Sequence, residues 1–272
     1  MPRKSPTPKV DSKEEECHSV FHYHACAHAF GGQFSRPFHD LIEVQAPAVL
    51  PIVGGYGNSR VENFRYREFI HFTKAYTHVS GGFQESDKSN NTLATATLEG
   101  LNILDVLTAD RVVARLYTKH PHCKDEGSVS MAGSKFENLK IAGHPIDVEL
   151  DFDLFKNIRN FEEAQIAYKS NADFRKIAED PFQTGRKLLQ QDANGAYLCS
   201  LVKETNIKHP GVERTGHCFY VPGFGKVFLA EVVIAHGERT LTMFRLELGS
   251  SLAGSGSGCY ATSNGRNIPP PP

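Results

Sequence analysis

The sequence predicts a mainly β protein, an antiparallel β-sandwich or barrel-like sheet with a short helical insertion at about residues 158–190. Side chains alternate between acidic and apolar over residues 147–154, which is typical of a strand with one buried face. Two β-rich runs, residues 226–236 and 239–248, are separated only by Gly237 and Glu238, which predicts a hairpin with a type II′ turn. Residues 227–235 are apolar on nearly both faces, which predicts a central strand. A single stretch, residues 161–178, is rich in helix formers.

The first predicted strand lies at residues 17–28, which hold four of the thirteen histidines. Because successive side chains of a strand point to opposite faces, His22, His24 and His28 would share one face opposite an apolar one. His22 and His24 lie about 6.6 Å apart along such a strand, and with a ligand from another strand they are candidates for binding zinc or another divalent metal. The simpler alternative is a histidine stripe that faces solvent or another chain.

The next residues that favour strands form four runs: 41–50, 64–79, 92–98 and 109–118. Pro47 and Pro51 indicate an edge or irregular path for the first run. Gly54-Gly55-Tyr56-Gly57 predicts a loop, and exposed Tyr and Phe on such loops would suit a carbohydrate or another small ligand. Phe69 breaks the alternation of the second run, which indicates a bulge or a strand buried on both faces.

A second group of candidate metal ligands is the segment His120-Pro121-His122-Cys123. Histidine and cysteine are the usual ligands of structural zinc. Neighbouring side chains of an extended chain diverge, so His120 and His122 would need partners from elsewhere in the fold. The alternative is coincidence in a histidine-rich chain.

One face of the predicted strand at 147–154 is acidic, with Asp147, Glu149, Asp151 and Asp153. Carboxylates can bind Ca²⁺, but the glycine and loop spacing of an EF-hand are missing. Arg111 and Arg115 share a face of another predicted strand and are candidate partners of these acids, within the chain or between subunits. We therefore interpret the acidic and arginine faces as a candidate interface.

The strand and helix patterns indicate a single β-rich domain over residues 17–253, with the helical insertion at 158–190. Residues 1–16 are rich in Pro, Lys and Glu, which predicts a disordered tail. Residues 254–272 are rich in Gly and Ser and end in four prolines, which predicts a polyproline II tail that could bind a protein partner. Trp is absent and Phe is abundant, so the aromatic core is expected to consist of Phe.

Composition and motifs exclude several classes of function. A net charge of −1 argues against nucleic acid as a partner, and no apolar run approaches the ~20 residues of a membrane span. The N-terminal residues lack the apolar core of a secretory signal, so a cytoplasmic location is expected, with export by a non-classical route left open. The chain has no nucleophile elbow, phosphate-binding loop or zinc-protease motif, so we assign no catalytic residue and lean towards a protein that is not an enzyme.

Four segments carry a family resemblance: TATLEGLNILDVLTAD at 95–110, GSKFENLKIAGHPI at 133–146, VPGFGKV at 221–227 and ERTLT at 238–242. They resemble a loosely defined set of uncharacterised bacterial β-rich proteins related to the choice-of-anchor P family. The resemblance implies an all-β fold and no catalytic residue. Choice-of-anchor proteins are typically exported, whereas residues 1–16 carry no export signal. The histidine-rich segment and the helical insertion lie outside the four matches.

These observations predict a non-enzymatic, structural β protein that self-associates into an oligomer or a larger assembly. No cofactor is expected in such a protein. The first alternative is a metal-binding protein or metalloenzyme that uses His22 and His24 with zinc or another divalent metal. The second alternative is a module that binds a carbohydrate or another small ligand.

Overall fold

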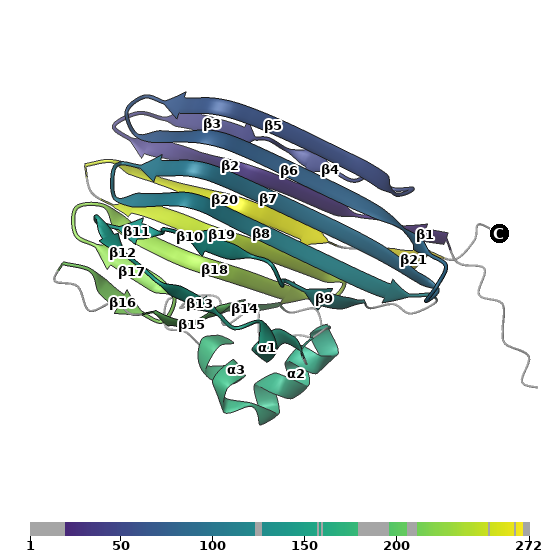
Figure 1. Cartoon of the computed structure of the whole chain (residues 1–272). Coiled ribbons are helices and arrows are strands. Elements are labelled where there is room, and N and C mark those ends of the chain that lie inside the picture. Colours follow the sequence, from purple (N-terminus) through teal and green to yellow (C-terminus); the bar gives the residue numbers. More distant parts are fainter. Residues whose placement is uncertain are drawn as a thin grey trace, which may run out of the picture.

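The computed structural model describes residues 20–122, 127–156, 158, 160–178, 196–205, 211–249, 251–263 and 265–268. Most of these residues form two large antiparallel sheets that pack face to face (Figure 1). The mainly β class, the antiparallel pairing and the short helical insertion are therefore confirmed.

The first sheet, called sheet 1, has eight strands. Its main path is β12 (His144–Pro145), β11 (Lys140–Ile141), β8 (Leu107–Pro121), β7 (Ser89–Ile103), β6 (Ile70–Gln84) and β5 (Gly55–Tyr66). The short strands β9 (Ser128–Ser130) and β10 (Lys135–Glu137) also pair with β8. β5 is thus the last strand at one edge of this sheet.

The second sheet, called sheet 2, has nine strands. Its main path is β16 (Glu213–Thr215), β17 (Cys218–Val221), β18 (Gly225–Ala235), β19 (Glu238–Gly249), β20 (Ala253–Ser263), β2 (Ala25–Arg36) and β3 (Asp40–Gln45). β14 (Ala196–Ser200) pairs with β18, and β4 (Ala48–Val49) pairs with β2. β3 is the last strand of this path, on the same side of the sandwich as β5 (Figure 1).

Smaller elements complete the described chain. β1 (Val20–His22) pairs with β21 (Arg266–Ile268), and β13 (Val148–Leu150) pairs with β15 (Val202–Thr205). The helices are α1 (Phe152–Lys156), α2 (Phe161–Ser170) and α3 (Ala172–Ala178). They lie together at the edge of the sandwich opposite β3 and β5 (Figure 1). None of the described helices is long and apolar enough to cross a membrane.

The core lies between the two sheets, where β2 and β20 pack against β6 and β7. Small side chains on the central strands, such as those of Ala27, Ala94 and Ala96, are fully or almost fully buried and allow close approach of the sheets. Phe30, Phe72, Phe219 and Phe244 are the largest fully buried side chains on the strands. The described core is therefore rich in Phe, as expected from the composition.

The prediction of a polyproline II tail at residues 254–272 is wrong for most of these residues. Residues 253–263 form β20, which lies in the middle of sheet 2 between β19 and β2. A Cβ atom on Gly258 would overlap the Phe244 ring, and one on Gly254 would overlap the Gln33 carbonyl oxygen. The glycines thus permit close packing rather than flexibility. The prolines at 269–272 and the predicted tail at 1–16 lie outside the described residues.

Three predictions about strands and turns are also wrong. The run at 64–79 is not one strand, because the chain reverses between β5 and β6 at residues 67–69, where Arg67 adopts φ +51°. The predicted loop at Gly54–Gly57 is largely strand, since β5 begins at Gly55. In the β18–β19 hairpin, Ala235 pairs with Glu238, so the two loop residues are His236 and Gly237. The positive φ of +70° falls on Gly237, the second loop residue, whereas a type II′ turn needs it on the first.

The acidic strand predicted at 147–154 ends early. Strand β13 covers only Val148–Leu150, and helix α1 begins at Phe152 with Asp153 in its first turn, where a negative charge is favourable. The helical prediction at 161–178 is confirmed, but as two helices. The Asn171 side chain accepts hydrogen bonds from the backbone N–H groups of Asp173 and Phe174, which starts a new helix. Residues 179–190 of the predicted insertion lie outside the described residues.

Candidate functional site

The histidine-rich segment alternates as predicted but does not form one continuous strand. Phe21, Tyr23, Ala25 and Ala27 are buried, and His22 and His24 lie on the other face. The strand is interrupted at residues 23–24, which separate β1 from β2. His28 of β2 stacks on Tyr260, with the two ring centroids 4.6 Å apart. Among the described residues no three His, Cys, Asp or Glu side chains converge on one point. Metal binding by His22 and His24 stays a prediction.

His120 and His122 occupy different environments. His120 is buried between the sheets, with its ring 5.1 Å from that of Phe21, and its Nδ1 has no hydrogen-bond partner in the described structure. Burial, and then the charge of Arg239, lower the pKa of His120 to about 4. A neighbouring cavity of about 10 Å³ is large enough for one water molecule. His122 is exposed, and Cys123 lies outside the described residues. The two imidazoles therefore do not converge.

Two residues of the predicted interface, Glu149 and Arg111, have other partners within the chain. Glu149 pairs with Lys203 of the neighbouring β15, with Oε1 and Nζ 2.9 Å apart. Arg111 donates a hydrogen bond to the Tyr76 hydroxyl at 2.7 Å and lies 3.7 Å from Glu99. Asp147, Asp151 and Asp153 are placed at or beyond the ends of β13. Contact of these groups with a second subunit stays a prediction.

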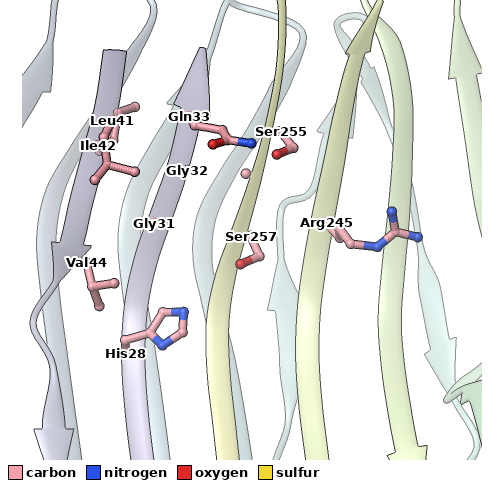
Figure 2. Close-up of a pocket in the computed structure, with 11 residues that line it drawn as sticks. His28, Gly31, Gly32, Gln33, Leu41, Ile42, Val44, Arg245, Ser255 and Ser257 are labelled. Carbon is pink, nitrogen blue, oxygen red and sulfur yellow. The ribbon is translucent and has the colours of Figure 1, made fainter. Parts of the chain in front are cut away.

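The outer face of sheet 2 carries a groove of about 370 Å³ (Figure 2). We call it the sheet-2 groove, and its lining residues are His28, Gly31, Gly32, Gln33, Leu41, Ile42, Val44, Arg245, Ser255, Gly256 and Ser257. Its floor consists of small residues of β2 and β20, such as Gly31 and Ser257. Leu41 and Val44 of β3 form a wall on one side, and Arg245 of β19 lies on the other (Figure 2).

The cationic group of Arg245 is neutralised by Glu231 of β18 and by Glu247 of its own strand, β19. Its Nε donates to Glu231 Oε2 at 2.6 Å, a second nitrogen donates to Oε1 at 2.9 Å, and a third pairs with Glu247. The guanidinium lies 3.7 Å from the centre of the Phe228 ring, away from the groove floor (Figure 2). The groove therefore presents the apolar stem of Arg245 rather than a free charge.

Glu231 is the centre of this charge network and is only 6% exposed. Its Oε1 also accepts a hydrogen bond from the His217 Nε2–H group at 3.2 Å. Burial alone would raise the pKa of Glu231, but hydrogen bonds from Arg245 and His217 outweigh burial and lower this pKa to about 2. Glu231 is therefore an ionised, structural carboxylate and not a proton donor near neutral pH.

The groove adjoins an apolar edge of the sandwich. Ten large apolar side chains are exposed among the described residues, and six of them lie between residues 41 and 56. These six are Leu41, Val44, Val49, Ile52, Val53 and Tyr56. Single exposed apolar residues are ordinary, but a concentration of this kind marks a contact surface.

Two features of this site could be predicted from the sequence: its edge strand and its buried carboxylate. The run at 41–50 was predicted as an edge strand, and β3 and β4 confirm that position. Glu231 interrupts the apolar run that predicted a central strand, and a buried carboxylate requires a partner. The identity of that partner, Arg245, follows only from the register of β18 and β19.

Comparison with known proteins identifies a family but no function. No curated protein matches the chain, and no solved structure does so either. The model of the domain of unknown function DUF8256 matches residues 21–235, which is most of the sequence. The chain therefore belongs to this family of domains of unknown function.

Proposed function

We propose that this protein is a non-enzymatic β-sandwich that self-associates through the sheet-2 groove and the adjoining edge of β3 and β4. The observation that carries the proposal is the exposure of Leu41 (74%) and Val44 (48%) beside a floor of glycine and serine. A projecting apolar wall next to a shallow depression is a surface that can complement a second copy of itself. Two-fold symmetric dimers use such a self-complementary patch.

The energetics favour covering this surface. Burial of one Leu or Val side chain contributes about 1.5–3 kcal/mol, and the exposed side chains of Leu41, Val44 and Val49 lie on β3 and β4. Because Glu231 and Glu247 already pair with Arg245, a second chain could cover the groove without burying an uncompensated cation. β3 is also the last strand of its sheet path, and an edge strand offers backbone groups to another chain.

The test is the mass of the protein in solution, measured by size-exclusion chromatography with light scattering over a wide range of concentrations. We expect an oligomer for the natural chain and a monomer for the double variant Leu41→Lys/Val44→Lys. The matched control is Ile166→Lys, which places the same charge on an exposed apolar position of α2, at the opposite edge. A natural chain that stays monomeric at all concentrations would contradict the proposal.

A further inference from the structure

A second groove, of about 390 Å³, lies on the outer face of sheet 1. We call it the sheet-1 groove and define it by six of its lining residues: Ser80, Phe83, Asn91, Leu93, Arg115 and Tyr117. It belongs to the other sheet, so it is separate from the surface proposed for self-association. Its volume is in the range of ordinary small-ligand sites, about 300–1,000 Å³.

The strand register brings the side chains of Ser80, Asn91, Leu93, Arg115 and Tyr117 to one face, whereas Phe83 follows Ser80 by three residues and lies on the other. Leu93 of β7 is paired with Ser80 of β6 and with Tyr117 of β8, so these three side chains stand in one row across the sheet. Arg115 lies two residues from Tyr117 and therefore points to the same face. The space above the sheet is open at two glycines, because a Cβ atom on Gly55 or Gly82 would meet no atom within 4 Å.

Arg115 is held in place without a counter-charge. Its backbone N–H donates to Ser134 Oγ at 2.9 Å, and the Ser134 hydroxyl donates back to the Arg115 carbonyl at 3.2 Å. Its aliphatic stem passes close to Gly133, where a Cβ atom would lie 3.2 Å from Arg115 Cδ. The guanidinium is exposed and forms no ion pair or side-chain hydrogen bond with any described residue.

The chemistry of the groove selects one class of ligand. No Asp or Glu is among its lining residues, and Arg115 is its one charged group. A guanidinium binds a carboxylate through two parallel hydrogen bonds. The ring of Tyr117 offers an apolar face for the C–H face of a sugar, and Ser80 and Asn91 can exchange hydrogen bonds with hydroxyl groups. We propose that the sheet-1 groove binds an acidic carbohydrate, that is, a sugar that carries a carboxylate.

The test is isothermal titration calorimetry of the full chain with an oligogalacturonate and with a neutral galactose oligomer of equal length. We expect saturable binding of the acidic oligomer and binding of the neutral one at least about tenfold weaker, the loss that one charge-assisted hydrogen-bonded pair predicts. The variants Arg115→Gln and Tyr117→Ala should each weaken binding of the acidic oligomer by about tenfold or more.

Two controls keep the result specific. Arg60→Gln removes an exposed arginine that already pairs with Glu62 on the same sheet, and it should leave the affinity unchanged. The double variant Leu41→Lys/Val44→Lys should also bind normally, because its substitutions are on sheet 2. The inference is overturned if the acidic oligomer does not bind, if the neutral oligomer binds equally well, or if Arg115→Gln binds like the natural chain. Equal unfolding midpoints in urea for all variants confirm that the comparison is between folded proteins.

Discussion

Arg245 and Arg115 lie on the outer faces of the two sheets, and their surroundings differ in one decisive respect. Arg245 is surrounded by Glu231, Glu247 and the Phe228 ring, so its charge is fully compensated inside the chain. Arg115 has its backbone fixed by Ser134, but no described residue compensates its charge. The first arrangement stabilises the fold beneath an apolar contact surface, and the second leaves a positioned cation for a ligand.

The largest expected effect is the removal of Glu231. We expect Glu231→Ala to lower the free energy of unfolding by about 3–5 kcal/mol, because it leaves the Arg245 guanidinium without its buried partner. Urea unfolding at neutral pH measures this change. The matched control is Glu247→Ala, which removes an exposed partner of the same arginine and should cost less than about 1 kcal/mol. Equal losses of unfolding free energy in the two variants would show that the buried pairing of Glu231 with Arg245 stabilises the fold no more than the exposed pairing of Glu247.

Acid should break the same network within a defined pH window. The pKa of Glu231 is about 2 in the folded chain against an ordinary value of 4.5. Because the folded pKa is lowered, the stabilisation is complete above about pH 4.5 and is lost as the pH falls towards 2. The difference of about 2.5 pKa units corresponds to roughly 3 kcal/mol.

The measurement for this second prediction is the difference in unfolding free energy between the natural chain and Glu231→Gln as a function of pH. We expect a constant difference above pH 4.5 that shrinks steadily below it. The same measurement on Arg115→Gln should give a flat profile, since Arg115 has no carboxylate partner among the described residues. If the difference in unfolding free energy between the natural chain and Glu231→Gln stays constant between pH 5 and 3, ionised Glu231 does not stabilise the folded chain.

The positions of several strands could be predicted from the sequence, but the partners of these two arginines could not. The pattern of apolar residues predicted the mainly β class and the central position of β18, and Pro47 and Pro51 predicted the edge position of the run at 41–50. The compensation of Arg245 and the isolation of Arg115 depend on which residues face one another across strands, and periodicity does not determine register. Strand β20 was missed for a different reason. Its alternating Gly and Ser are also the composition of a linker, and only its contacts with β2 and β19 show that it is a central strand.

The third prediction compares glycines of the two sheets. Gly258 of β20 faces the core, where a Cβ atom would overlap the Phe244 ring, so Gly258→Ala should destabilise the fold by about 1–3 kcal/mol. Gly82 of β6 lines the sheet-1 groove, where a Cβ atom meets nothing within 4 Å, and Gly82→Ala should change stability by less than about 0.5 kcal/mol. Thermal unfolding of both variants gives the comparison. Equal stability losses would mean that close sheet packing does not explain the glycines of β20.

The smallest expected effect on stability belongs to Arg115, and it is the most informative about function. Arg115→Gln should change the free energy of unfolding by less than about 0.5 kcal/mol in urea, because an exposed side chain without an ion pair contributes little to the folded state. A clear loss of stability would show that Arg115 is a structural residue like Arg245. If instead stability is unchanged and binding of the acidic oligomer is lost, the arginine contributes to recognition alone. Arg245 cannot take this role, since Glu231 and Glu247 already compensate its charge within the chain and three of its five N–H donors are used.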